Sequence, residues 1–307
     1  FCMMGFGMLA RRLNMIDRDA ASRMSRVVTN FFYPALIFTT LVSNFNIRVL
    51  AENWVLPAGT IVIMSTGYLF GIIFHRLIKF SGEKEKNQFL FQCTINNYSF
   101  LPLPIVLMLW GNPGVAGLIF SSLGSEVCVW TFGVFALTGN KFRKENLKQL
   151  LSVPMIAIFA SVAVMALRDF AFGALGFTAS PFLKDLGGSF FSVLDIFGKG
   201  TIPVAMFIAG SRIAELKPHH LFTPTQGYVV ALRLIVIPAV TALILLLLPF
   251  SLEARMILLL VATMPSAIAS VVLSEVYDSD TEFAASCVLT THLFKTTLAI
   301  AEGMVAT

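Results

Sequence analysis

The stretch Asn96-Asn97-Tyr98-Ser99-Phe100-Leu101-Pro102-Leu103-Pro104 places two prolines and several polar side chains inside an apolar run from 88 to 110. A run of this length is enough to cross a lipid bilayer as one helix. Proline has no backbone N–H and clashes with the preceding turn, so Pro102 and Pro104 predict a break in that helix. The backbone groups freed by the break need polar partners inside the protein, and Asn97 and Ser99 are suited to this role.

Apolar runs recur along the whole chain, separated by short polar loops, which we call joints. The 307 residues are 57% hydrophobic and only 13% charged, whereas a soluble domain carries about 25% charged residues. This composition excludes a soluble fold and predicts an all-α integral membrane protein in a lipid bilayer. The first run is short, so we expect further residues upstream of Phe1. We expect ten transmembrane helices, near residues 1–10, 28–43, 53–78, 88–110, 114–138, 150–168, 186–213, 226–250, 256–276 and 283–305.

The cations are distributed unequally between the joints. The net charge is +5, but a nucleic-acid-binding protein would cluster its cations on one exposed face. Here they lie between apolar runs, so we expect no nucleic-acid partner. The joints on one side of the membrane hold fifteen Lys and Arg residues, and the opposite joints hold only Arg48, Arg168, Lys184 and Arg255. The positive-inside rule therefore predicts that the first set is cytoplasmic and that both chain ends are not.

Prolines at related positions indicate an internal repeat. Pro34 and Pro203 each precede an apolar stretch. The number of residues between Pro104 and Pro265 is similar to the number between Pro34 and Pro203. We interpret residues 1–140 and 150–307 as two five-helix repeats, joined by a short cytosolic linker at 141–149. Because five is odd, the second repeat enters the membrane in the opposite sense, a frequent plan among secondary transporters.

The predicted breaks in the fourth and ninth helices suggest an anion site. A half-helix that starts at a break presents unpaired N–H groups with a partial positive charge, and a carboxylate is a natural ligand for such groups. Ser266, next to Pro265, provides a hydroxyl at the second break. In the alternative interpretation the prolines only kink ordinary helices. Their recurrence at repeat-related positions favours the two breaks.

Ionisable residues inside the apolar runs are functional candidates, because burying a charge in a bilayer is costly. Glu126 and Lys295 have the same separation in the sequence as the repeat-related prolines of the second and seventh runs, so the repeat predicts equivalent positions for them. Glu126 either carries a coupling proton or is a permanent counter-ion of Lys295. Lys199 either neutralises an anionic ligand or pairs with Asp195 one turn earlier. For Arg233 we expect a structural partner or a side chain that snorkels towards the membrane surface.

Four segments together resemble the auxin efflux carrier family, which includes plant PIN proteins and many bacterial organic-anion carriers. The resemblance covers nearly the whole chain and is carried by Phe32-Tyr33-Pro34-Ala35-Leu36-Ile37-Phe38, Asn97 to Pro104, Gly200 to Gly210, and Met264-Pro265-Ser266-Ala267-Ile268-Ala269. It implies a ten-helix inverted-repeat fold like that of bile-acid symporters, in which broken helices four and nine cross. It also implies elevator-type alternating access and a homodimer.

The same resemblance assigns roles to individual residues. Asn97 and Pro104 match the asparagine and proline of the fourth-helix crossing, and Pro265 matches the proline of the ninth. Pro102 departs from the small residue common in the family at that position. The predicted substrate-binding residues are Asn96, Asn97, Ser99, Pro104, Lys199, Pro265 and Ser266, and the predicted coupling residues are Glu126 and Lys295.

The sequence therefore predicts secondary active transport of a small organic anion, for example malate, malonate or an auxin-like acid. The resemblance implies efflux, and we expect transport to be coupled to protons or driven by the membrane potential. Sodium sites of the bile-acid type use acidic and amide side chains near the ninth-helix crossing, whereas this run offers only one hydroxyl there, so we do not expect sodium coupling. Backbone carbonyls at the break are the alternative ligands for sodium. Neither an enzymatic motif nor a metal-ligand cluster is present in the sequence, and we expect no cofactor. The alternative is a membrane sensor of the same fold that binds a ligand without turnover.

Overall fold

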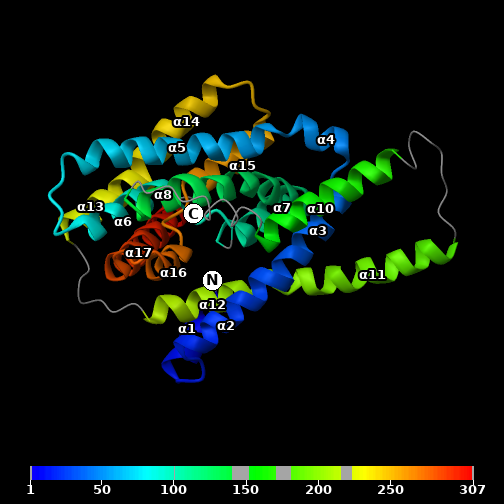
Figure 1. Ribbon diagram of the computed structural model, residues 1–307, viewed down its shortest axis with the longest axis horizontal. Coiled ribbons are helices and arrows are strands. Elements are labelled where there is room, and N and C mark those ends of the chain that lie inside the picture. Colours follow the sequence, from blue (N-terminus) through cyan, green and yellow to red (C-terminus); the bar gives the residue numbers. More distant parts are fainter. Residues whose placement is uncertain (1, 100, 140–151, 171–180, 216–222, 306–307) are drawn as a thin grey trace. The chain divides into compact units, whose positions relative to one another are not determined.

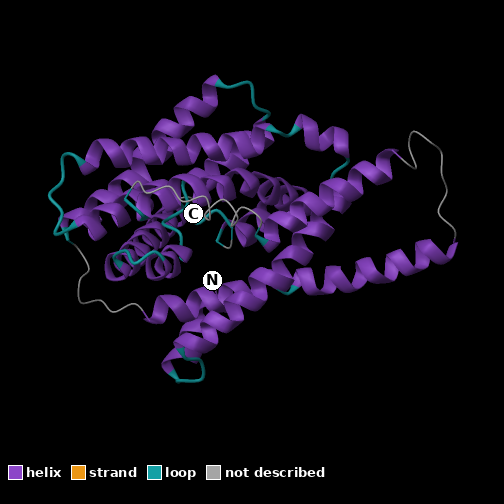
Figure 2. Cartoon of the chain, viewed as in Figure 1, coloured by secondary structure: helices purple, strands orange, loops and turns teal. Residues whose placement is uncertain are grey.

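The computed structural model describes residues 2–99, 101–139, 152–170, 181–215 and 223–305, and the linker predicted at 141–149 lies outside these ranges. Within them the regular structure is helical, with one isolated β-bridge and no strand, as Figure 2 shows. The chain divides into two compact units, and each unit takes segments from both halves of the sequence. The units are therefore not the two predicted repeats, and the inverted repeat stays a prediction.

The first unit comprises Phe1–Val55, Leu103–Leu123 and Leu151–Glu215. Within it α3 packs against α10 and α11, and α1 packs against α12 (Figure 1). Its elements are α1 (Cys2–Arg12), α2 (Arg18–Val27), the π-helical turn η1 (Val28–Phe32), α3 (Tyr33–Asn44), α4 (Ile47–Glu52), most of α7 (Pro102–Cys128), α10 (Val153–Arg168), α11 (Pro181–Lys199) and α12 (Thr201–Glu215).

The second unit comprises Leu56–Pro102, Gly124–Leu150 and Leu216–Thr307. Its central element is α6, because Phe91 of this helix belongs to one buried apolar cluster and Phe89 to another. The elements are α5 (Val55–His75), α6 (Glu83–Thr94), the end of α7, η2 (Val129–Gly133), α8 (Val134–Leu137), α13 (Pro224–Ala231), η6 (Leu232–Val236), α14 (Ile237–Leu247), α15 (Leu252–Ala262), α16 (Ala269–Val276) and α17 (Thr281–Val305).

Several helices are suited to a bilayer. Among the described residues five helical runs are long and apolar enough to cross a membrane, namely Arg18–Asn44, Ile47–His75, Pro102–Leu137, Gly187–Ile208 and Pro224–Leu247, and the shorter Val153–Arg168 is also apolar. These runs confirm an integral membrane protein, while the total of ten spans stays a prediction. A break divides each of the predicted spans 88–110 and 256–276. The first span consists of the end of α6, a helix of 12 residues, and the start of α7; the second consists of most of α15 and of α16, which has 8 residues. Such helices are too short to cross alone.

The joint predicted between residues 110 and 114 lies inside the element α7. Gly111 has a φ of 63° and a ψ of −157°, so two helices meet there instead of one continuing. Only glycine adopts such a conformation without strain. The first part of α7 therefore completes the broken fourth run, and the second part is the start of the predicted fifth helix.

The prolines have two different structural effects. Tyr33-Pro34 follows directly on the π turn η1, and Ile237-Pro238 follows directly on η6, while the helix continues through both sites. A π turn shifts the hydrogen-bond register, which accommodates a residue that has no N–H to donate. Pro102 and Pro265, in contrast, lie at interruptions of the helix, as the sequence predicts.

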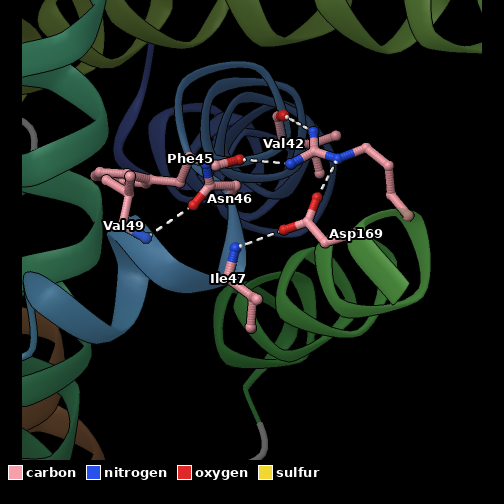
Figure 3. Close-up of polar contacts among 7 residues, drawn as sticks. Val42, Phe45, Asn46, Ile47, Val49 and Asp169 are labelled. Atoms are coloured by element: carbon pink, nitrogen blue, oxygen red, sulfur yellow. Dashed lines mark hydrogen bonds and ion pairs between the residues drawn. The ribbon is translucent and has the colours of Figure 1, made fainter. Parts of the chain in front are cut away.

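In the first unit the ends of three helices are joined by a surface joint, which Figure 3 shows. Arg168, at the end of α10, donates to the carbonyls of Val42 and Phe45 at the end of α3, in both cases at 2.9 Å. The carboxylate of Asp169 pairs with Arg168 at 2.9 Å and accepts the N–H of Ile47, the first residue of α4, at 2.7 Å. We define the surface joint as Val42, Phe45, Asn46, Ile47, Val49, Arg168 and Asp169.

Candidate functional site

The two broken runs meet at their breaks. α6 ends at Thr94 and α7 begins at Pro102, while α15 ends at Ala262 and α16 begins at Ala269. Between them Asn96 and Ser266 form an antiparallel β-bridge, and the N–H of Asn97 donates to the carbonyl of Pro265 at 2.8 Å. We call segments 95–99 and 263–268 together the crossing. The structure thus brings together four residues that the sequence predicts as site residues, namely Asn96, Asn97, Pro265 and Ser266.

Side chains hold the two breaks in place. The Nδ2 of Asn96 donates to the carbonyl of Val261, so the first break is tied to the end of α15. The N–H of Ser266 donates to the hydroxyl of Thr291 at 3.2 Å, so the second break is tied to α17. These bonds satisfy backbone groups that a helix would otherwise satisfy, as a break inside a membrane protein requires.

Polar atoms at the crossing are left unpaired. Asn96 is 0%, Asn97 6% and Ser266 0% exposed. Within the described part of the chain, the Oδ1 of Asn96, the Nδ2 of Asn97 and the Oγ of Ser266 are buried without a hydrogen-bond partner. A buried polar group without a partner costs about 1–3 kcal/mol. Three such groups at one place make the crossing the candidate site of this chain.

Fewer backbone donors are available than the sequence argument for half-helix N-termini assumes. Pro102 and Pro104 have no N–H, so among the first three residues of α7 only Leu103 offers a donor. At the start of α16 the N–H groups of Ser270 and Val271 already donate to the carbonyls of Ala267 and Ile268. The side chains of the crossing are therefore considered together with these backbone donors as the candidate site.

The predicted coupling residue Glu126 is connected to the crossing. Its Oε1 accepts the hydroxyl of Tyr98 at 2.8 Å, and its Oε2 accepts the indole N–H of Trp130 at 3.0 Å. Tyr98 is part of the first break, two residues after Asn96. Lys295 is half-buried on α17, and its pairing with Glu126 stays a prediction.

The remaining predicted residues differ in their surroundings. Lys199, at the end of α11, belongs to the first unit, and its ammonium pairs with Asp195 while its side chain is 74% exposed. Of the two interpretations of Lys199, the ion pair one turn apart is therefore the one observed. Ser99 is half-buried within the first break, and Pro104 is half-buried in the first turn of α7.

Sequence reasoning missed two residues that surround Glu126. Tyr98 lies within the stretch that predicts the first break, but only its more polar neighbours were predicted as site residues. Trp130 follows Glu126 by four residues, a spacing that places two side chains on the same face of a helix. This spacing could have identified Trp130, whereas only the folded chain shows that Tyr98 reaches Glu126.

The fold and the crossing define a class of protein. Over the described residues the chain is helical, several helices are long and apolar enough to cross a membrane, and two helix breaks are paired in the interior, as in a multi-pass membrane protein. The chain belongs to the family described as membrane transport protein, which matches residues 1–300. This match confirms the resemblance to auxin efflux carriers.

Two archaeal proteins are similar to this chain over most of its length. An uncharacterized transporter of Methanocaldococcus jannaschii is 25% identical over 293 residues, which are 94% of this chain and 90% of that protein. An uncharacterized transporter of Methanothermobacter thermautotrophicus is 23% identical over 286 residues, 92% of this chain and 88% of that protein. The family and both relatives are described as transporters and not as enzymes.

Proposed function

We propose that this protein is a secondary active transporter that moves a small organic anion, such as a mono- or dicarboxylate, through the crossing. The observation that carries the proposal is the pair of buried, unpartnered donors at the crossing, the Nδ2 of Asn97 and the Oγ of Ser266. Both can donate to a carboxylate, and hydrogen bonds to a charged acceptor are about twice as strong as neutral ones. Membership of a transport family supports turnover of the ligand.

The division into two units supports an elevator-type mechanism. All residues of the crossing and Glu126 belong to the second unit. A binding site built within one compact body suits alternating access in which that body carries the ligand. Efflux and non-cytoplasmic termini are further parts of the proposal, and they rest on the family resemblance and on the unequal distribution of cations.

Glu126 is the proposed coupling residue. A proton on its carboxyl changes which of its two hydrogen bonds, from Tyr98 and Trp130, remain. Because Tyr98 belongs to the crossing, a change at Glu126 reaches the ligand site through a single side chain. This link gives a physical route by which proton binding and ligand binding influence each other.

Uptake by proteoliposomes tests the proposal. The purified chain is reconstituted, and the flux of labelled malonate, malate and an aromatic carboxylic acid is measured under imposed pH, sodium and voltage gradients. We expect saturable flux of at least one of these acids. Asn97→Ala should raise its KM by about 10-fold or more, because a hydrogen bond to a charged group contributes about 1.5–3 kcal/mol. Asn44→Ala is the matched control, since the Nδ2 of Asn44 donates to the carbonyl of Thr40 in the first unit.

Two results would contradict the proposal. Binding of an acid without any flux would support the sensor instead. An unchanged KM in Asn97→Ala, in protein that is otherwise folded, would show that the crossing is not the ligand site.

A further inference from the structure

Arg233 connects the two helices that stop at the crossing. It lies on η6, between α13 and α14, and is 0% exposed. Its Nη1 donates to the carbonyls of Cys93 at 2.8 Å and Thr94 at 3.5 Å, and its Nη2 donates to the carbonyl of Ala262 at 3.4 Å. Cys93 and Thr94 end α6, and Ala262 ends α15. One guanidinium therefore bridges the carboxyl ends of both half-helices, and Arg233 does not snorkel.

These two helix ends form a site of negative potential. The last four carbonyls of a helix have no partner within it, and the carboxyl end is the negative end of the helix dipole. In transporters with broken helices, such carboxyl ends and unwound carbonyls coordinate the coupling cation. In this protein the same atoms are occupied by a side chain of the chain itself.

The charge of Arg233 is balanced by these helix ends. The acceptors that its Nη atoms reach are backbone carbonyls, its Nε has no partner among the described residues, and none of the carboxylates whose side chains are described lies within ion-pair distance of it. The site is also closed from the side of α5, because a Cβ at Gly67 would lie only 2.3 Å from the carbonyl oxygen of Cys93. Backbone thus covers the carbonyl that Arg233 binds most closely.

We propose that Arg233 is a resident cation of the crossing. It holds the ends of α6 and α15 together as a bound coupling cation would, and it makes the crossing independent of Na⁺ or another monovalent cation. Arg233 is a positioning residue, since it acts on the ligand site through the two helix ends. The inference rests on the proposed function in taking the crossing as the ligand site, but the need for a cation is measurable without any ligand.

The experiment measures the thermal midpoint, Tm, of the purified full chain at constant ionic strength in choline chloride, NaCl, KCl or a low concentration of guanidinium chloride. We expect the wild-type Tm to be the same in choline, Na⁺ and K⁺. Arg233→Ala should lower the Tm by several degrees in choline chloride, and guanidinium should restore most of this loss with saturation. Na⁺ should also raise the Tm of Arg233→Ala relative to choline. Arg233→Lys keeps a cation and should be indifferent to the salt.

Arg168→Ala is the matched control, because Arg168 also donates to the last carbonyls of a helix. It should show no saturable rescue by guanidinium, since its site is open to solvent. A wild-type Tm that rises with Na⁺ would overturn the proposal, and so would an Arg233→Ala protein that guanidinium and Na⁺ do not stabilise. If Arg233→Ala does not fold, the wild-type and Arg233→Lys measurements still decide the question. A failure of the proposed transport would leave these Tm differences unchanged.

Discussion

The crossing and the surface joint use the same kinds of residue for opposite purposes. Each involves an arginine that donates to the last carbonyls of a helix, Arg168 at the surface joint and Arg233 next to the crossing, together with an asparagine at a helix end. At the surface joint Arg168 is 37% exposed and has the carboxylate of Asp169 as partner. At the crossing Arg233 is 0% exposed and binds backbone carbonyls alone. The surface joint connects helix ends with a partly exposed ion pair, whereas at the crossing a charged side chain is fully buried.

The two clusters also differ in whether their asparagine side chains have hydrogen-bond partners. At the surface joint the Oδ1 of Asn46 accepts the N–H of Val49 at 2.8 Å as an ordinary helix N-cap. At the crossing the Nδ2 of Asn97 has no partner among the residues that the structure describes. A buried polar group without a partner needs an explanation, and at the crossing we propose a ligand.

Removing the two arginines should have very different effects on stability. Arg233→Met leaves several buried carbonyls without a donor, at about 1–3 kcal/mol for each, so we expect a loss of about 3 kcal/mol or more. Arg168→Met removes a partly exposed ion pair, which contributes about 0–1 kcal/mol. Denaturant unfolding in detergent micelles measures both. Equal losses would remove the distinction between the two clusters.

The two carboxylates should differ in their effect on transport. Glu126→Gln is expected to abolish the stimulation of flux by a pH gradient, and Tyr98→Phe should weaken it, because Tyr98 joins Glu126 to the crossing. Asp169→Asn serves as the control and should retain the full response. The measurement is initial flux in proteoliposomes with and without the gradient. Full pH dependence in Glu126→Gln would exclude it as the coupling residue.

The asparagine of the surface joint should matter for stability alone. Asn46→Ala removes an N-cap and is expected to lower the free energy of unfolding by about 1 kcal/mol. Its transport KM should equal that of the wild type, in contrast to Asn97→Ala. A higher KM would mean that the surface joint contributes to ligand binding.

The smallest effect is expected from the acid titration of Asp169. Hydrogen bonds from Ile47 and Arg168 hold the pKa of this carboxyl below its ordinary value of 3.8. Its contribution to stability is therefore complete above that ordinary value and is lost as the pH falls through the lowered pKa. Asp169→Asn should reduce the loss of stability below about pH 4. Unfolding curves of both proteins over this range measure the difference, and parallel curves would contradict the assignment.

Much of the fold was predictable, because apolar runs and prolines act locally. The runs predicted helices that the structure confirms in most places, with the joint between residues 110 and 114 observed at Gly111. Pro102 and Pro265 correctly predicted the breaks, since no helix accommodates a missing N–H without compensation. Pro34 did not break its helix, because the π turn before it absorbs the change of register. The sequence does not reveal which prolines are accommodated in this way.

The candidate site was predictable in part. Asn96, Asn97, Pro265 and Ser266 were selected from their position beside the breaks, and the structure brings them together. Lys199 had two predicted roles, neutralising a ligand or pairing with Asp195, and the conformation of its flexible side chain decides between them. In the structure it pairs with Asp195. The sequence allows two interpretations of Arg233. Its partners are backbone carbonyls, and no residue type in the sequence indicates such partners.

A helical membrane protein with two interrupted helices follows from the amino-acid sequence, because hydrophobic length and proline chemistry depend only on neighbouring residues. Three contacts appear only in the folded chain: Asn96 pairs with Ser266 from the other half of the sequence, Tyr98 reaches Glu126, and Arg233 joins two helix ends. Such contacts arise when segments distant in sequence pack together, and the stability of a buried charge depends on what that packing places around it.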